Sequence, residues 1–139
     1  MTELNFKEFT HLQAMEMGLE AVRLVKERQW RRIGVRVILH DTLVFQYLMD
    51  GKNEDNYLKG KINVVTETGL NSDDVYHRRD EFEHLLEKAE YCVSGGALPI
   101  VVEGAVYGAI AISGMTQERD HELALEVLNN VYTRAMGTE

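Results

Sequence analysis

Alternating apolar residues in the first half of the chain limit the fold most strongly. In residues 33–39 every second side chain is apolar, which is the period of a strand with one buried face. The alternation resumes after His40-Asp41-Thr42 with Leu43, Phe45, Tyr47 and Met49. This segment predicts two antiparallel strands joined by a tight turn, and such a hairpin needs another layer of structure to cover its apolar face.

Helical patterns account for most of the remaining chain. Residues 9–29 and 117–135 each place their apolar side chains on one side of a helical wheel. A turn at 50–53 precedes a further helix, which Asn53 or Asp55 would cap and which stops near Gly69. Another helix is expected at 75–90, after Ser72-Asp73-Asp74.

Two more strands are expected between the last two helices. A Gly95-Gly96 loop precedes apolar residues 98–102, and Pro99 suits the start of a strand or an edge because it lacks an N–H group. Residues 105–112 form the next strand. This order predicts an α+β fold, a central antiparallel β-sheet flanked by helices, in a single domain over residues 1–139. The nucleotide-binding patterns GxGxxG and GxxxxGK[ST] are missing from the sequence.

Composition narrows the class of protein. The 139 residues include 15 Lys and Arg against 23 Asp and Glu, and the resulting charge of −8 argues against nucleic acid as a partner. No apolar stretch is long enough to cross a bilayer, and the first twelve residues do not resemble a secretory signal. We therefore expect a cytoplasmic protein that contacts neither nucleic acid nor membrane.

The pair Asp120-His121 is the most informative anomaly. Asp120 projects within the apolar arc of the last predicted helix, and His121 lies at its border. One interpretation is a ligand site at the helix N-terminus, where first-turn N–H groups favour an anion and His121 transfers protons or ligates a metal. The other is structural, with Asp120 stabilising the helix dipole and His121 bonded to a loop carbonyl.

Three further positions have the same two interpretations. Lys61 points to the middle of an apolar helix face, where it either extends past the core to solvent or holds an anionic group. Gly95 and Gly96 form either a plain turn or a close approach to a ligand. Ser113 ends a strand outside any GxSxG context, which argues against a serine nucleophile.

The remaining candidate groups favour no metal site. No two histidines have HxxxH spacing, and the single cysteine, Cys92, has no basic neighbour in the sequence that would activate it. We expect Cys92 to be an inert core or edge residue.

Two stretches resemble a known family. Residues 55–57 with 61–65 (DNY…KINVV) resemble the "DNW…RKxNVV" element of the UPF0303 proteins, and residues 95–100 followed by Gly104, Gly108, 113–114, Gln117 and 120–123 resemble their "GGAFPI…G…VSGLPQxxDH" element. Tyr57, Gly60 and Leu98 depart from the pattern, and residues 71–93 match only at Ser72. This group is similar to the wider haem-degrading HbpS/GlcG-like domain family.

The resemblance implies a profilin-like α/β sandwich, higher homo-oligomers and haem as a possible cofactor. The candidate ligand-binding residues are then Asn56, Lys61, Gly95, Gly96, Ser113, Asp120 and His121, with no metal site. Three hypotheses remain: a protein that binds haem or another small anionic ligand near the last helix, a non-catalytic homo-oligomeric scaffold or adaptor, and an enzyme in which Asp120 orients His121 as acid and base.

Self-association is expected on a separate ground. Paired glycines, methionines and the apolar strand 105–112 would leave exposed edges in a small isolated sheet.

Overall fold

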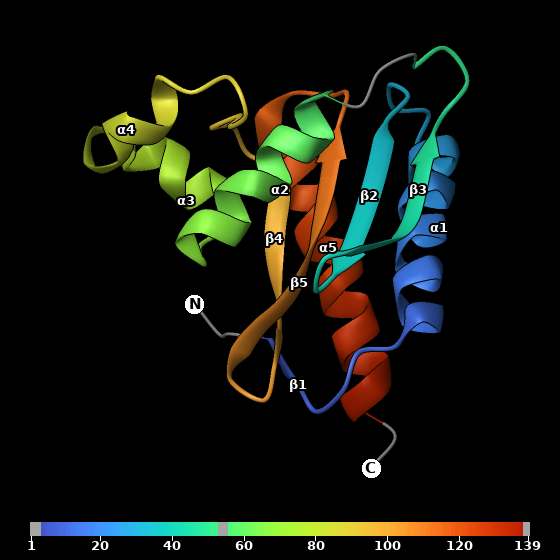
Figure 1. Ribbon diagram of the computed structural model, residues 1–139. Helices are drawn as coiled ribbons and strands as arrows, with labels where there is room; N and C mark the ends of the chain where they lie inside the picture. The colour runs from blue at the N-terminus through green and yellow to red at the C-terminus, as the bar shows by residue number, and fades with distance from the viewer. Residues whose placement is uncertain (1–3, 53–55, 138–139) are drawn as a thin grey trace.

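The computed structural model describes residues 4–52 and 56–137. These residues fold around a five-stranded sheet (Figure 1). Its strand order is β1-β4-β5-β2-β3. The elements follow along the chain as β1 (Asn5–Phe6), α1 (His11–Glu27), β2 (Gly34–Leu39), β3 (Thr42–Leu48), α2 (Asn56–Thr68), α3 (Ser72–His77), the short 3₁₀ helix η1 (Arg79–Phe82), α4 (Glu83–Leu86), β4 (Ala97–Val102), β5 (Ala105–Ser113) and α5 (Gln117–Met136).

The predicted hairpin is confirmed. Strands β2 and β3 pair antiparallel from Gly34 opposite Leu48 to Leu39 opposite Thr42, so the turn is as tight as the sequence indicates. His40 adopts a φ of 54° in this turn. The α+β class and the flanking helices are confirmed as well. The predicted cap of α2 at Asn53 or Asp55 lies outside the described residues.

The sheet differs from the expectation in two ways. It is mixed, because the two residues of β1 pair parallel with Val101 and Val102 of β4; so short a strand shows no periodicity in the sequence. Strand β5 lies in the centre, hydrogen-bonded to β4 and β2, so residues 105–112 are not the exposed edge we expected. The long edge of the sheet is β3, and the opposite edge carries the two-residue β1.

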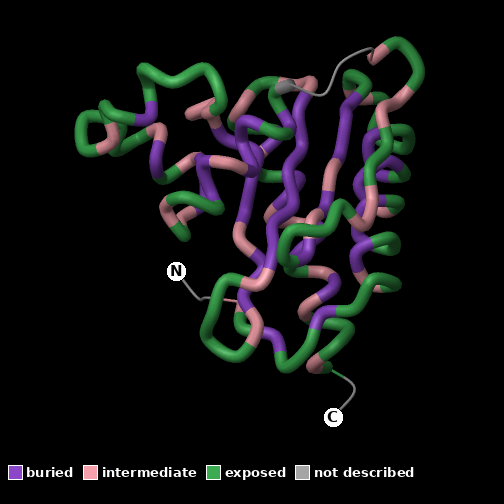
Figure 2. The backbone as a smooth tube through the Cα atoms, viewed as in Figure 1, coloured by how far each residue is buried: buried purple, intermediate pink, exposed green. Residues whose placement is uncertain are grey.

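Helices cover both faces of the sheet. Helices α1 and α5 pack side by side on one face and enclose the larger core, whereas α2 packs on the other face against β4 and β5 (Figure 1). Burial is concentrated in the central strands, while most of β3 and the α3–α4 region is exposed or half-buried (Figure 2). Within 4–52 and 56–137, no helix has both the length and the hydropathy needed to span a membrane.

The single helix predicted over 75–90 is wrong. The chain forms α3, η1 and α4 in succession, with breaks at Arg78 (φ −115°, ψ 30°) and Phe82 (φ −128°, ψ 33°). Val75 and Leu85 are both buried in one small cluster with Val64 of α2. A straight helix would separate them by about 15 Å along its axis, so the breaks let both side chains reach the same cluster.

The packing of this small cluster can be tested with two substitutions at neighbouring positions. Leu85 is 1% exposed and the adjacent Leu86 is 48% exposed. We expect Leu85→Ala to lower the free energy of unfolding by roughly 2–5 kcal/mol because it leaves a cavity. Leu86→Ala should change it by less than about 0.5 kcal/mol. Urea denaturation of both variants measures the difference, and equal effects would contradict the packing described here.

Candidate functional site

A buried ion pair joins α2 to the first turns of α5. Lys61 and Asp120 are 3% and 2% exposed, and the Lys61 ammonium lies 3.2 Å from Asp120 Oδ2. The same ammonium donates to the carbonyl oxygen of Ile112 at 3.0 Å. Asp120 Oδ1 accepts from the backbone N–H of Met115 at 3.1 Å. Lys61 therefore does not extend to solvent, and its charge is held inside the protein.

Burial and the neighbouring groups shift the pKa of Asp120 in opposite directions. Burial raises the pKa of the Asp120 carboxyl, and the Lys61 ammonium and the N–H groups of Met115 and Gly114 oppose that rise. These N–H groups lie in the loop before α5, whereas Thr116 caps the helix itself by accepting from Arg119 N–H. Asp120 thus holds the loop that connects β5 to α5 as well as the lysine.

The paired glycines make room for this pair. A Cβ on Gly96, which has a φ of 135°, would lie 2.4 Å from the carbonyl oxygen of Ile112 and 2.7 Å from Lys61 Nζ. A Cβ on Gly95 would lie 2.8 Å from the carbonyl oxygen of Gln117. Both residues are therefore required by close packing of the Lys61–Asp120 pair and of the start of α5.

One cleft opens beside this ion pair, and we call it the lysine cleft. Its volume is about 500 Å³. Its lining includes the polar residues Arg31, Lys52, Lys61, Ser94, Ser113 and Gln117. Cys92 also lines it; burial raises the pKa of that thiol, and the Lys61 ammonium opposes the rise.

His121 lines a different hollow, the histidine cleft, of about 350 Å³. The lining is largely apolar and includes Leu4, Leu70, Leu98, Pro99, Leu125 and Leu128. Asn71 and Asp74 are its other polar members. His121 Nδ1 is buried and has no hydrogen-bond partner in the described part of the chain. The loop carbonyl that the structural interpretation gave His121 is therefore not bonded to Nδ1.

The structure thus divides the predicted site residues. Lys61, Ser113 and Asp120 line the lysine cleft, His121 lines the histidine cleft, and Gly95 and Gly96 line neither. Consecutive residues of a helix point about 100° apart, which lets Asp120 and His121 face different hollows. Asp120 is not bonded to His121 Nδ1, so the acid–base pair of the enzyme hypothesis does not form through that atom. Asn56 begins α2, and its side chain lies outside the described part.

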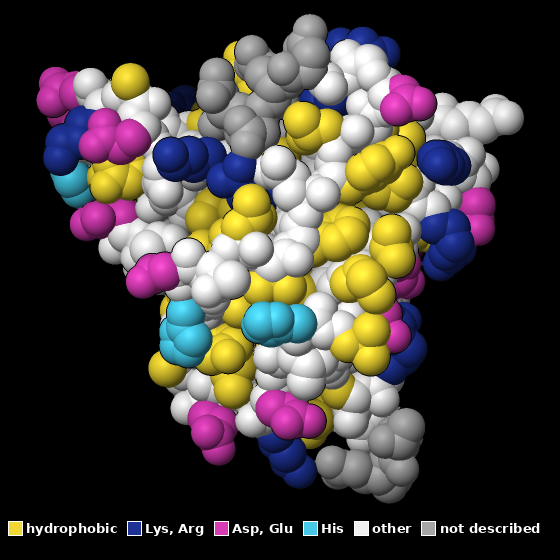
Figure 3. Space-filling model, turned by 45° about the vertical axis from the view of Figure 1, so that its right-hand side comes forward, with side chains coloured by type: hydrophobic (Ala, Val, Ile, Leu, Met, Phe, Trp, Pro, Cys, Tyr) yellow, Lys and Arg dark blue, Asp and Glu magenta, His cyan; other side chains and the backbone are white. Residues whose placement is uncertain are grey.

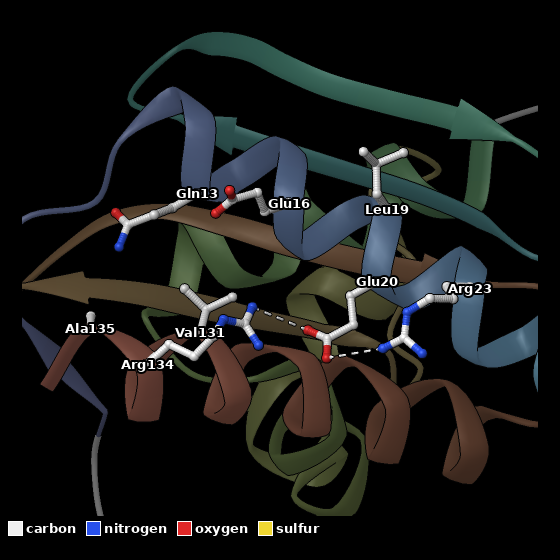
Figure 4. A pocket seen from close by; sticks show the side chains of 8 residues that line it. All are labelled: Gln13, Glu16, Leu19, Glu20, Arg23, Val131, Arg134 and Ala135. Carbon is white, nitrogen blue, oxygen red and sulfur yellow. Dashed lines mark hydrogen bonds and ion pairs between the residues drawn. The ribbon is translucent and has the colours of Figure 1, made fainter. Parts of the chain in front are cut away.

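A third hollow, of about 630 Å³, lies between α1 and α5 and holds none of the predicted residues (Figure 4). Glu20 lies at its centre, 3.7 Å from Arg23 and 3.5 Å from Arg134, and accepts from Asn130. The carboxylate of Glu20 is therefore neutralised by the arginines on either side of it. Across residues 4–52 and 56–137, no three His, Cys, Asp or Glu side chains gather closely enough to hold a metal ion.

Sequence reasoning missed several lining residues. Arg31 and Lys52 belong to segments that we interpreted as a helix end and a turn, and they give no sign of a shared site. Gln117 was quoted only as part of the family pattern. Its Oε1 accepts from the Gly95 N–H at 2.9 Å and from the Ser94 hydroxyl at 3.3 Å. The match of Gln117 to the family pattern was the one sequence feature that could have pointed to a lining residue.

The ion pair can be tested by a double-mutant cycle. We expect Lys61→Met and Asp120→Asn each to lower the free energy of unfolding by roughly 3–5 kcal/mol, because each leaves one buried group without its partner. The double variant should lose less than the sum of the two, by about 1–3 kcal/mol. The exposed pair Arg78–Glu81 is the control, and its two changes should be additive. Additive losses at Lys61 and Asp120 in urea denaturation would contradict the coupling.

This chain is similar to known proteins over most of its length. The family described as "Haem degrading protein HbpS-like" matches residues 9–129. A UPF0303 protein of Burkholderia thailandensis is 33% identical over 134 residues, covering 90% of this chain and 81% of that protein.

Solved structures support the fold. The crystal structure of the Ybr137w protein has a TM-score of 0.83 at 21% identity, covering 97% of this chain and 83% of that one. The crystal structure of a PduOC:Heme complex has a TM-score of 0.75 at 15% identity, covering 87% of this chain and 93% of that one. From the extent of the family match and from the relative in Burkholderia, we conclude that this chain belongs to the haem-degrading HbpS-like family.

Proposed function

We propose that this protein binds haem in the histidine cleft, with His121 as the ligand to the iron. The observation that carries the proposal is an imidazole without a hydrogen bond among the described residues, set in a largely apolar hollow. Histidine is a common axial ligand of haem iron, and apolar walls suit the macrocycle. The family name and the haem complex of the structural neighbour PduOC support haem as the ligand.

The lining of the histidine cleft fits haem in two respects, because it offers a histidine to the iron and apolar side chains to the macrocycle. His121 Nδ1 is buried and has no hydrogen-bond partner in the described part, so no protein contact at that atom competes with a role of this imidazole as the iron ligand. No Lys or Arg belongs to this lining, so the haem propionates would have to remain in water. When bound, haem would supply redox and oxygen chemistry, and the protein would supply the ligand and the apolar walls.

Haemin titration tests the assignment. The unaltered protein should give a saturable Soret shift, which His121→Ala should remove because the iron loses its ligand. His84→Ala is the matched control, since His84 is exposed on α4 and should leave the shift unchanged. A shift that survives in His121→Ala, or that disappears equally in both variants, would overturn His121 as the ligand.

A homo-oligomeric scaffold is the second candidate, and one surface favours it. Strand β3 is an exposed edge, and large hydrophobic side chains gather on it and on the neighbouring helix α1 (Figure 3). They are Leu12, Met15, Leu19, Leu43 and Tyr47, exposed by 40–58%. Exposed edges and apolar patches of this kind are typical of association surfaces. We propose that copies of this chain associate through α1 and β3.

Light scattering at micromolar concentration tests the scaffold. We expect a dimer or a larger assembly, which Leu19→Glu should dissociate by placing a charge in the contact. Leu86→Glu introduces the same charge at an equally exposed position on α4 and should leave the assembly intact. A strict monomer before any substitution would rule out the scaffold hypothesis.

A further inference from the structure

Unused hydrogen-bond donors gather in the lysine cleft. Lys61 has three N–H groups and gives one to Ile112 and one to Asp120, which leaves one without a partner in the described residues. Ser113 is 6% exposed, and its hydroxyl has no bond to any described residue. Gln117 turns Oε1 toward Ser94 and Gly95, so its Nε2 amide group has no partner there either. All three residues line the cleft, so these donors are available to an acceptor bound there.

Apart from Asp120, the charged residues that line the cleft are cationic. Arg31 and Lys52 line it and form no ion pair within 4–52 and 56–137, although the whole chain carries −8. The carboxylate of Asp120 is neutralised by Lys61 and by the Met115 N–H. The cleft therefore presents three kinds of donor, ammonium, hydroxyl and amide, together with two unpaired cations, while its one carboxylate is already occupied.

From this surplus of donors we propose that the lysine cleft binds the phosphate group of a small phosphorylated molecule. A dianion with several acceptor oxygens can take the Ser113 hydroxyl, the Gln117 amide and the free Lys61 N–H together, with Arg31 and Lys52 at the open side. The volume of about 500 Å³ is within the range of small-molecule sites and accommodates more than a phosphate group. The N-terminus of α5 adds a favourable dipole near Gln117.

This site is independent of haem binding. His121 is absent from the lysine cleft, and Arg31, Lys52 and Ser113 are absent from the histidine cleft. Each cleft can therefore be altered alone. Lys61 and Asp120 are poor test positions, because changing them removes the ion pair that holds α2 against α5.

Calorimetric titration with inorganic phosphate and with glycerol phosphate at low ionic strength tests the proposal. The unaltered protein should bind in a saturable manner, and Arg31→Gln/Lys52→Gln should weaken binding at least tenfold. Lys26→Gln/Lys88→Gln removes the same charge from exposed positions elsewhere and should weaken it less than twofold. Ser113→Ala should weaken it about fivefold, the loss of one hydrogen bond.

The outcomes separate the alternatives. Tighter binding of glycerol phosphate assigns the cleft to a phosphate ester, and equal binding assigns it to free phosphate; both support the site. No saturable binding, or equal weakening by the two double variants, overturns it in favour of diffuse attraction at the surface. His121→Ala should retain phosphate affinity, and Arg31→Gln/Lys52→Gln should retain the haemin Soret shift, so failure of one site is distinguishable from failure of the other.

Discussion

A lysine on one face of the sheet and an aspartate on the other meet at the end of β5, and much of the molecule is arranged around that contact. Lys61 comes from α2 and Asp120 from α5, and the carbonyl of Ile112 lies beside them. Removing both charges from water is costly, and the cost is offset only if each charge keeps its partner and its hydrogen bonds. Gly95, Gly96 and the loop at Met115 provide that environment.

The ion pair also explains why the region has two hollows. Because Asp120 is held by Lys61 and Met115, α5 begins in a fixed orientation, and His121 is directed away from the lysine. The hollow on the histidine side is largely apolar, and the one on the lysine side carries donors and cations. This difference in lining underlies the two proposals, haem in one hollow and a phosphate group in the other.

Helical periodicity correctly predicted that two of these charged residues point inward. The wheel placed Lys61 and Asp120 inward, and both are buried. It could not show that they bind each other, because they lie 59 residues apart in the sequence. The pattern at 57–65 also offered no explanation for Gly60, which departs from the UPF0303 element. A Cβ there would lie 2.8 Å from Cys92 Cβ, so the close packing of Cys92 excludes a side chain at this position.

The sequence by itself determined the elements whose side chains alternate with a clear period: the β2–β3 hairpin, α1, α2 and α5, and with them the α+β class. Tertiary structure alone decided the parallel pairing of β1, the central place of β5 and the breaks within 75–90. It also decided which polar groups found partners and which remain free to bind a ligand. Periodicity reports which face of an element is buried, whereas partners and clefts depend on contacts between segments far apart in the chain.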